Sequence, residues 1–399
     1  MHFQRIELSQ HHAWAEVSSF IPEHGVKEYH LLLHVDPLAD RFNGQSERLL
    51  AAYKYLLDST FINCQPVMHR YFLSDIANQA ELLEESLRVR EFESSKECLS
   101  NTLSPSNLPG AISLIGQTPL DGSKIALWAY LTEGLEVHNQ KDLTVTSHNG
   151  YHHYWSTNWQ STLEGSHAQT RQILEGYEAQ LAHSGQCLAD HCLRTWFFIR
   201  DVDTNYQGMV EARRSNFTQQ QLTPQTHYIA STGIGGQPIQ RQSLVQMDAY
   251  AASGLQPSQQ QYLYAPTHLN PTYQYGVTFE RGTAIHYGDR SHVLISGTAS
   301  INNRGEVVHV GNVVEQAHRM LENIQTLLSE AGAGLNDIAQ AIIYLRDVSD
   351  YPVIRDLFEA RLPQMPRVFT LAPVCRPAWL IEMECIAIVP AQYQHYPEY

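Results

Sequence analysis

Hydrophobic and polar positions repeat one unit of helix and strand along the chain. Residues 169–201 and 316–347 each begin with Gln, carry leucines at helical spacing and reach a glycine sixteen residues on. An apolar run that ends in Arg-Asp follows in both segments. This order predicts an amphipathic helix, a glycine that ends it, a short loop and a buried strand. Residues 44–75 carry a fainter copy, so three units are predicted, whose strands end at Asp75, Asp201 and Asp347.

A second helix is predicted behind each strand, most clearly over residues 205–217 and 350–362. The chain is therefore expected to fold as tandem units of mixed helices and strands, which is an α+β architecture. Residues 218–275, rich in Gln, Pro, Tyr and Gly, are expected to connect two units, with a tight turn at 231–236. The expected units are a degenerate first unit at 1–110, a second unit at 111–244 and a C-terminal unit carrying the site at 245–399.

Composition and charge narrow the function. The chain has 399 residues, of which 43% are hydrophobic and 17% charged, as in globular proteins with sizeable cores. A formal net charge of -15 without a compensating Lys/Arg run opposes binding to nucleic acid. Neither a signal-like N-terminus nor a window of ~18 apolar residues is present in the sequence, so we expect a cytoplasmic protein with no membrane partner.

Cysteine and histidine spacing gives no pattern typical of a disulfide framework or a metal site. The six cysteines lack the close spacing of a disulfide-rich domain, so reduced thiols are expected. There are 21 histidines, but the pairs at 11–12 and 152–153 put neighbours on opposite faces of a strand. We therefore expect no metal, and no cofactor.

One predicted strand combines apolar and acidic residues. Within residues 372–387, Glu382 and Glu384 fall on one face of an alternating pattern and apolar side chains on the other. Carboxylates on a half-buried strand ordinarily face water. The alternative is a general acid in a cleft beside a cation, and the pattern alone leaves both open.

The motifs "LISGTASI" (294–301), "YLRDVSDY", "MPRV" and "IEMECIAIV" follow one another within residues 279–390. With them the C-terminal unit resembles the Rid (YjgF-like) family, small α+β proteins that form trimers with ligand clefts between subunits. The resemblance implies three tandem Rid-like (chorismate mutase-like) units that form an intramolecular pseudo-trimer, as a monomer or a small homo-oligomer. It also implies that Arg367 binds a substrate carboxylate opposite Glu382, which lies fifteen positions later and positions a water molecule.

A second set of motifs covers roughly residues 190–390, namely "RTWFFI", "YIASTGIGG", "FERGT", "SGTASI" and "CRPAWLIEME". In this order they resemble the chorismatase family, enzymes with Rid-like units that hydrolyse chorismate. The resemblance implies release of pyruvate from chorismate, giving a hydroxybenzoate or a dihydrodiol, by a hydrolase or lyase. It implies that Glu382 is the catalytic acid and that Cys375 marks the branch producing 3-hydroxybenzoate.

Chorismate carries two carboxylates and an enolpyruvyl ether, so its site needs two cations and one proton donor. We expect Arg367 and Arg194 to supply the cations, with Arg213 behind Arg194, and Glu382 to supply the proton. Cys375 is a candidate nucleophile during loss of water from the ring, against the alternative of an inert buried thiol. Glu384 is expected to turn outward into solvent.

Three other functions use parts of the same residue set. A Rid-type enamine or imine deaminase would use Arg367 and Glu382, whereas a non-catalytic scaffold that binds a small acid would need only Arg367. The presence of both residues favours an enzyme with a small anionic, chorismate-like substrate. A ribonuclease is opposed by the net charge of -15.

Overall fold

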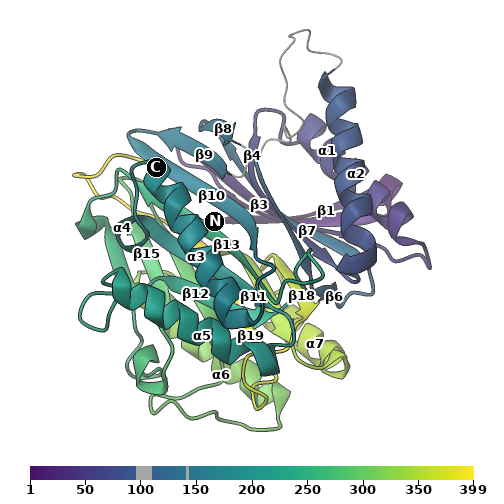
Figure 1. Ribbon diagram of the computed structural model, residues 1–399. Helices are drawn as coiled ribbons and strands as arrows, with labels where there is room; N and C mark the ends of the chain where they lie inside the picture. The colour runs from purple at the N-terminus through teal and green to yellow at the C-terminus, as the bar shows by residue number, and fades with distance from the viewer. Residues whose placement is uncertain (96–109, 141–142) are drawn as a thin grey trace.

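The computed structural model describes residues 1–95, 110–140 and 143–399, and its strands form three sheets (Figure 1). The first sheet has the strand order β1-β2-β3-β7-β4-β5. Two helices, α1 and α2, contact it. Its elements are β1 (His2–Leu8), β2 (Ala13–Phe20), β3 (Lys27–Val35), α1 (Phe42–Ser59), β4 (Gln65–Leu73), α2 (Ile76–Ser95), β5 (Ala111–Gly116) and β7 (Ile125–Glu133).

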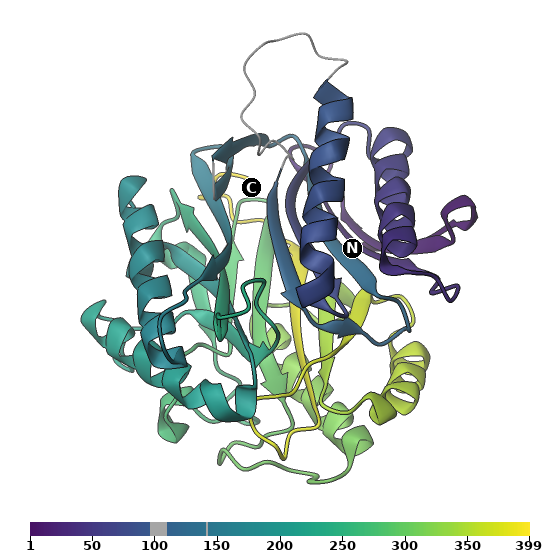
Figure 2. The same ribbon diagram turned by 45° about the vertical axis from the view of Figure 1, so that its right-hand side comes forward.

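The second sheet has the strand order β8-β9-β10-β13-β11-β12. Helices α3 and α5 lie side by side over it and extend along the outside of the molecule (Figure 2). Its elements are β8 (Glu136–Gln140), β9 (Leu143–His148), β10 (Tyr151–Gln160), α3 (Ser166–His183), α4 (Leu188–His191), β11 (Cys192–Ile199), α5 (Val202–Gln219), β12 (Ala230–Gly235) and β13 (Val245–Ser253).

The third sheet has the order β14-β15-β16-β19-β17-β18-β6, and its last strand, β6 (Thr118–Pro119), comes from the first unit. The other elements are β14 (Gln260–Leu263), β15 (Gly282–His286), β16 (Arg290–Ala299), α6 (Val313–Glu330), β17 (Ile338–Leu345), α7 (Tyr351–Arg361), β18 (Arg367–Leu371) and β19 (Ile381–Pro390). Short 3₁₀ helices connect elements at Ser9–His11, Pro257–Gln259, Thr272–Tyr275, Leu335–Asp337 and Val348–Asp350.

All three units have one topology, which confirms the predicted α+β fold of three repeated units. Three antiparallel strands are followed by a helix, a fourth strand, a second helix and a fifth strand parallel to the fourth; a last strand then inserts between the third and fourth. The predicted glycines Gly185 and Gly332 follow α3 and α6 with φ of 74° and 71°. A positive φ is strained for residues that have a Cβ atom but not for glycine, so glycine is favoured where the helix ends.

The limits of the sheets differ from the expected unit boundaries at 111 and 245. β5 and β7 belong to the first sheet and β13 to the second, so the sheets divide near residues 134 and 254. The last strand of each unit, such as β7 or β13, follows both helices of that unit. It lies outside the repeated segment that the sequence shows, which is why the expected boundaries fall too early. The expectation of a long connection over 218–275 is likewise wrong, because this segment contains β12, β13 and β14, and residues 231–235 are strand rather than tight turn.

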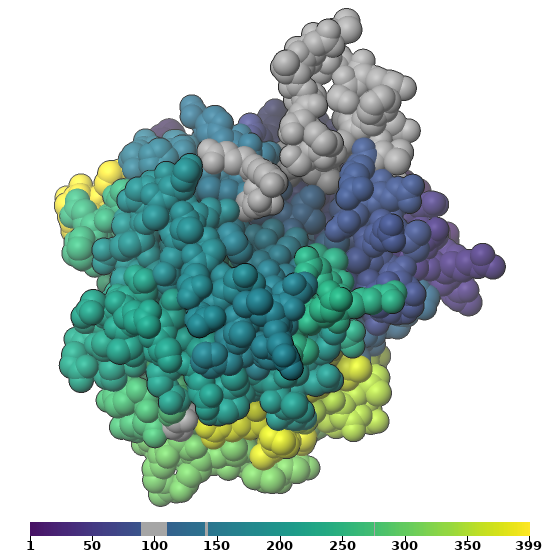
Figure 3. Space-filling model, in the orientation of Figure 1, coloured from purple at the N-terminus to yellow at the C-terminus, as the bar shows by residue number. Residues whose placement is uncertain are grey.

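The three sheets contact one another in cyclic order. β5 of the first unit contacts β10 of the second, β12 of the second contacts β16 of the third, and β17 of the third contacts β3 of the first. One apolar cluster joins all three units and includes Trp128, Trp196 and Ile342. In the space-filling view the first unit lies at the right and the second at the centre, and the third is visible along the lower edge and at the upper left (Figure 3). None of the described helices combines the length and apolar character needed to cross a membrane.

Candidate active site

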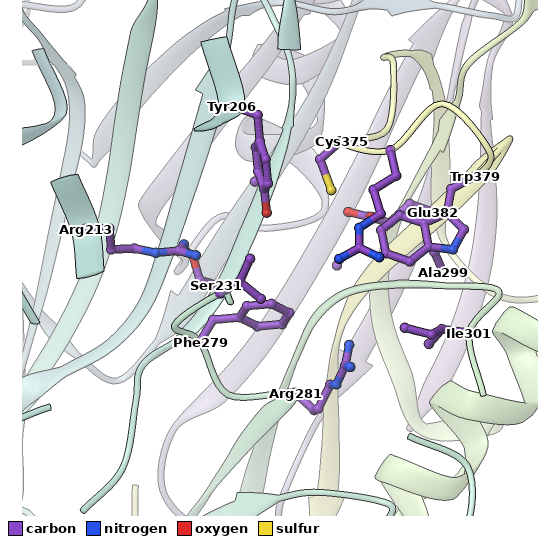
Figure 4. Close-up of a pocket in the computed structure, with 14 residues that line it drawn as sticks. Tyr206, Arg213, Ser231, Phe279, Arg281, Ala299, Ile301, Cys375, Trp379 and Glu382 are labelled. Atoms are coloured by element: carbon purple, nitrogen blue, oxygen red, sulfur yellow. The ribbon is translucent and has the colours of Figure 1, made fainter. Parts of the chain in front are cut away.

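A pocket lies between the second and third units, with an empty volume of about 520 Å³ including its opening. The second unit lines it with side chains from α5 and β12, and the third unit with side chains from β16, β19 and the loop before β19. Figure 4 shows Glu382 and Cys375 beside one another, with Tyr206 across from them and Arg213 and Arg281 further along the cavity. Of the five predicted site residues, three therefore line one pocket.

Glu382 is the buried acid of this pocket, with 5% of its surface exposed. It lies on β19 between Ala299 of β16 and Tyr344 of β17. A Cβ atom on Gly297 would overlap the Glu382 carboxyl, so the absence of a side chain there makes room for the acid. Burial, and then the charge of Glu384, raise the pKa of Glu382 to about 8, although Arg194 and Arg281 oppose the shift. Glu382 is therefore protonated at neutral pH and can donate that proton.

Glu384 also faces the interior, so the expectation that it turns outward is wrong. The residue is 2% exposed. It accepts hydrogen bonds from the Arg194 guanidinium and from Trp196 Nε1, both at 2.8 Å. The alternation along the strand was correct, but this face of β19 meets the other two sheets rather than water.

Arg194 supports the pocket from behind rather than lining it. Its side chain is 2% exposed. Besides Glu384, its guanidinium donates to Thr232 Oγ1 at 2.6 Å and Ser296 Oγ at 3.2 Å. The guanidinium is thus occupied by protein acceptors, and Arg194 is not among the side chains that line the cavity.

Arg367 lies in a different cleft, between the third and first units, with Trp14 and His34. It does not face Glu382. Its guanidinium donates to the backbone oxygens of Leu362 at 2.8 Å and Met365 at 3.1 Å, after the end of α7.

The cyclic contact of the sheets explains the separation of Arg367 from Glu382. The fifth strand of each unit faces the next unit, so Arg367 and Glu382 of one unit belong to successive clefts. Arg367 is opposite Ala341, six residues before Asp347, and Ser231 is opposite Thr195, six residues before Asp201. Ser231 is therefore the second unit's counterpart of Arg367, and it lines the pocket of Glu382.

Three arginines line the pocket instead of Arg367. Arg213 on α5 is 1% exposed and donates to the hydroxyls of Ser231 at 3.2 Å and Thr278 at 3.3 Å. Arg281 donates to the backbone oxygen of Asn270 at 3.1 Å. Arg376 lies over the ring of Trp379, 5.0 Å from its centroid. Three guanidinium groups around one protonated acid favour an anionic ligand.

Cys375 lies beside the acid as a neutral thiol. Burial, and then the charge of Glu382, raise the pKa of Cys375 to about 12, while a hydrogen bond with Tyr206 and the charge of Arg376 act in the opposite direction. The thiolate is the nucleophilic form of cysteine. This environment therefore opposes a nucleophilic role at neutral pH.

No site residue was predicted at Tyr206, Phe279, Arg281 or Trp379, although they line the pocket. Phe279 and Arg281 belong to the motif "FERGT", and Trp379 to "CRPAWLIEME". Both motifs indicated the family, and the same residues could have indicated side chains of the pocket. Tyr206 lies in a helix whose sequence carries no comparable motif.

A metal is opposed in this pocket by its three arginines. Elsewhere in the described ranges, Cys187, Asp190 and His191 bring three potential ligand atoms within 4.8 Å of one another at the start of α4. There His191 Nδ1 accepts a hydrogen bond from Cys187 N at 3.1 Å, and Asp190 accepts one from the Cys187 thiol at 3.2 Å. These hydrogen bonds stabilise the start of α4, and they give no reason to assign a metal site there.

Known proteins match most of the third unit. The family model described as Endoribonuclease L-PSP matches residues 283–389. The 3-aminoacrylate deaminase RutC of Acinetobacter baylyi is 34% identical over 99 residues, which are 24% of this chain and 79% of that protein. The chain belongs to the RutC (Rid) family. The predicted resemblance of the C-terminal unit is thereby confirmed.

Longer matches extend this Rid-family chain beyond one unit. The 3-hydroxybenzoate synthase of Streptomyces hygroscopicus is 28% identical over 218 residues, 49% of this chain and 63% of that protein, so the match spans less than two thirds of the synthase. A crystal structure described as chorismatase superposes with a TM-score of 0.61 and 16% identity, covering 81% of this chain and 93% of that one. The Rid-family chain therefore has the chorismatase fold.

Proposed function

We propose that this protein is a chorismatase-like enzyme that releases pyruvate from chorismate, with Glu382 as the proton donor. The observation that carries the proposal is a buried carboxyl with a pKa of about 8 in a pocket lined by three arginines. A sensor of small acids would need the arginines but not a protonated acid beside them. The likeness to a chorismatase fold and to a 3-hydroxybenzoate synthase supports the same reaction.

Arg213, Arg281 and Arg376 are the proposed anchors for the two carboxylates of chorismate. They approach the pocket from α5, from the segment before β15 and from the loop before β19, so they can hold two anionic groups apart. A planar guanidinium binds a carboxylate through two parallel hydrogen bonds. Phe279 and Trp379 add apolar walls suited to the ring of the substrate. Arg194 and Arg367, predicted earlier as anchors, have no such place in the proposal.

The proposed reaction begins with transfer of the Glu382 proton to the methylene carbon of the enolpyruvyl ether. The resulting oxocarbenium ion takes up water, and one proton of that water returns to the Glu382 carboxylate. The hemiketal then collapses, its carbon–oxygen bond to the ring breaks, and pyruvate leaves with a dihydrodiol. Loss of one water from the dihydrodiol gives a hydroxybenzoate, so the overall conversion consumes no water when the aromatic acid is formed.

Among the aromatic products, 3-hydroxybenzoate is the one we favour. Two points support it. In the chorismatase resemblance, a cysteine at the position of Cys375 marks the branch that produces 3-hydroxybenzoate, and the chain is similar to a 3-hydroxybenzoate synthase. Since Cys375 is a neutral thiol, its proposed part is to position water or a ring hydroxyl beside Glu382. We further propose that the chain works as an intramolecular pseudo-trimer, because three units of one topology contact each other cyclically.

The experiment is incubation of the purified protein with chorismate, with pyruvate followed by a coupled dehydrogenase and ring products by chromatography. The proposal expects pyruvate and one ring product in equal amounts, with Glu382→Gln as the inactive comparison. Glu322→Gln, an exposed glutamate on α6, is the matched control that should behave like the parent. Absence of pyruvate from the parent protein would overturn the proposal.

A Rid-type deaminase is the second candidate, supported by the identity to the 3-aminoacrylate deaminase RutC. It is disfavoured because Arg367 and Glu382, which that reaction would use together, line different clefts. Ammonia release from a small enamine or imine, without pyruvate release from chorismate, would favour it instead.

A further inference from the structure

Four charged side chains meet behind the pocket, and we call them the axial cluster: Arg70 of β4, Arg194 of β11, Asp248 of β13 and Glu384 of β19. Each is at most 2% exposed. Arg70 donates to Asp248 Oδ2 at 2.9 Å and lies 3.7 Å from Glu384 Oε1. Arg194 donates to Glu384 Oε2 at 2.8 Å. All three units therefore contribute to one buried network of two cations and two anions.

Three of the four residues of the axial cluster, Arg70, Asp248 and Glu384, belong to strand pairs at equivalent points of the three sheets. Arg70, Trp196 and Ile342 each lie five residues before the aspartate that follows their strand. Their cross-strand partners at these points are Trp128, Asp248 and Glu384. A trimer of identical subunits would repeat the same pair three times. Only a chain with three different units can put one arginine and two carboxylates together there.

The first unit supplies a cation to this cluster but has no counterpart of the catalytic acid. Glu382 is opposite Tyr344, three residues before Asp347, and at the same point of the first unit Ala126 is opposite Phe72. Arg70 is instead enclosed by acids and rings, with its guanidinium carbon 4.7 Å from the ring centroid of Trp196. Aromatic faces stabilise a buried guanidinium.

The balance of charges in the axial cluster sets the electrostatic environment of the Glu382 carboxyl. Asp248 accepts from Arg70, Ser113 Oγ and Asn158 N, and Glu384 accepts from Arg194 and Trp196. These donors surround both carboxylates, and Glu384 is the charged neighbour that acts most strongly on Glu382. In the part of the chain that the structure describes, no ion pair involves Glu382. The charged and titratable groups around the two glutamates are Arg70, Arg194, Asp248, Tyr344, Arg281, Arg376, Cys375 and Cys385.

We propose that Arg70, Asp248 and Glu384 are positioning residues whose charges govern the protonation of the neighbouring Glu382. The Glu384 charge favours the protonated form and the Arg70–Asp248 pair opposes it, so that the first unit contributes to chemistry between the other two. The geometry carries this inference, and the upward shift of the Glu382 pKa, of which Glu384 is the second cause after burial, agrees with it. For its catalytic consequence the inference rests on the proposed function.

Two variants should move the titration of Glu382 in opposite directions. Glu384→Gln removes the neighbouring anion and leaves Arg194 without a carboxylate partner, while Arg70 stays paired with Asp248. Glu382 should therefore lose its proton at a pH lower by about one unit or more. The double variant Arg70→Gln/Asp248→Asn removes one charge of each sign and leaves Glu384 balanced by Arg194 alone. Glu382 should then keep its proton to a higher pH than in the parent.

Two readouts separate this inference from the proposed function. The alkaline limb of the kcat/KM profile for chorismate reports Glu382 if the enzyme acts as proposed. Infrared titration of the buried carboxylic acid stretch, assigned by its loss in Glu382→Gln, reports the same group without any substrate. Opposite shifts in the two variants support the inference, and unmoved titrations or shifts in one direction overturn it. If Glu384→Gln does not fold, the double variant decides alone, and an unchanged or lower titration point overturns the inference.

Discussion

The cleft between the second and third units and the cleft between the third and first units are built from equivalent elements but hold different side chains. In both, the fifth strand and second helix of one unit face the third strand of the next. The first cleft has Ser231 on that fifth strand and a buried acid opposite it, whereas the second has Arg367 there and Ala126 at the position of the acid.

This difference teaches that a repeated scaffold can divide the parts of one site among its copies. The cleft of Arg367 contains an internal pair, His34 Nδ1 and Asp121 Oδ2 at 2.9 Å, with the imidazole stacked on Trp14. Its arginine holds backbone oxygens of its own unit. The cleft of Glu382 has instead an acid that holds its proton and arginines recruited from a helix and two loops. One cleft thus holds an arginine bound to its own unit, and the other holds the acid that the proposed reaction requires.

The largest expected effect is that of Glu382→Gln. The amide keeps the shape of the side chain but supplies no acidic proton, so turnover of chorismate should fall by ~10² to 10⁴ while substrate affinity is largely retained. Pyruvate release and substrate binding, measured separately, check this. Equal turnover in the variant and the parent would remove the acid from the mechanism and make the two clefts functionally alike.

Arg213→Ala and Arg367→Ala test the two clefts directly. Removing Arg213 should weaken substrate affinity by ~2 to 4 kcal/mol, or about 30- to 1,000-fold, because a buried carboxylate loses its charged partner. Arg213→Lys should restore little of it, since a point charge does not replace the planar fork. Calorimetric titration with substrate measures both.

Removing Arg367 should leave substrate affinity near that of the parent and instead lower the free energy of unfolding by ~1 to 3 kcal/mol, because two buried carbonyl groups lose their donor. Denaturant unfolding measures that loss. A stronger effect of Arg367 than of Arg213 on affinity would reverse the assignment of the clefts.

Gly297→Ala should lower turnover by ~10-fold, because the new methyl group overlaps the position of the Glu382 carboxyl and displaces it by a fraction of its length. Gly334→Ala is the control, since a Cβ there would meet other atoms only at ordinary contact distances. Steady-state kinetics compare the two. Parent-like turnover for Gly297→Ala would mean that the acid needs no such room.

The smallest effect is the pH dependence itself. Since the active form of Glu382 carries the proton, activity should be present below its pKa of about 8 and decline as the pH rises through that value. Above that pKa, activity should fall about tenfold for each further pH unit. A profile that is flat from pH 7 to 10 would contradict a proton donor with this pKa. Arg367→Ala should not move the profile, because its cleft is separate.

The sequence predicted the repeat well because its signals are local. Gly185 and Gly332 end helices where the pattern indicated, and the alternation put Glu382 and Glu384 on one face. What that face meets is a tertiary property, so the outward orientation expected for Glu384 was wrong. The pairing of Arg367 with Glu382 failed for a related reason: the two residues share a unit, but the partner of each lies in a different neighbour. Arg213, expected behind Arg194, lines the pocket itself from the helix after Asp201, and Arg194 lies behind it.

The two-residue strand β6 has a consequence for how the protein is made. Thr118 and Pro119 pair with Leu371 and Thr370, some 250 residues further along the chain. The ribosome therefore delivers β6 long before its partner strand exists, and long-range pairing of this kind is slow. Closure of the third sheet onto the first unit must therefore come after synthesis of the chain through Leu371. A chain cut between units should then yield fragments that complement one another when mixed.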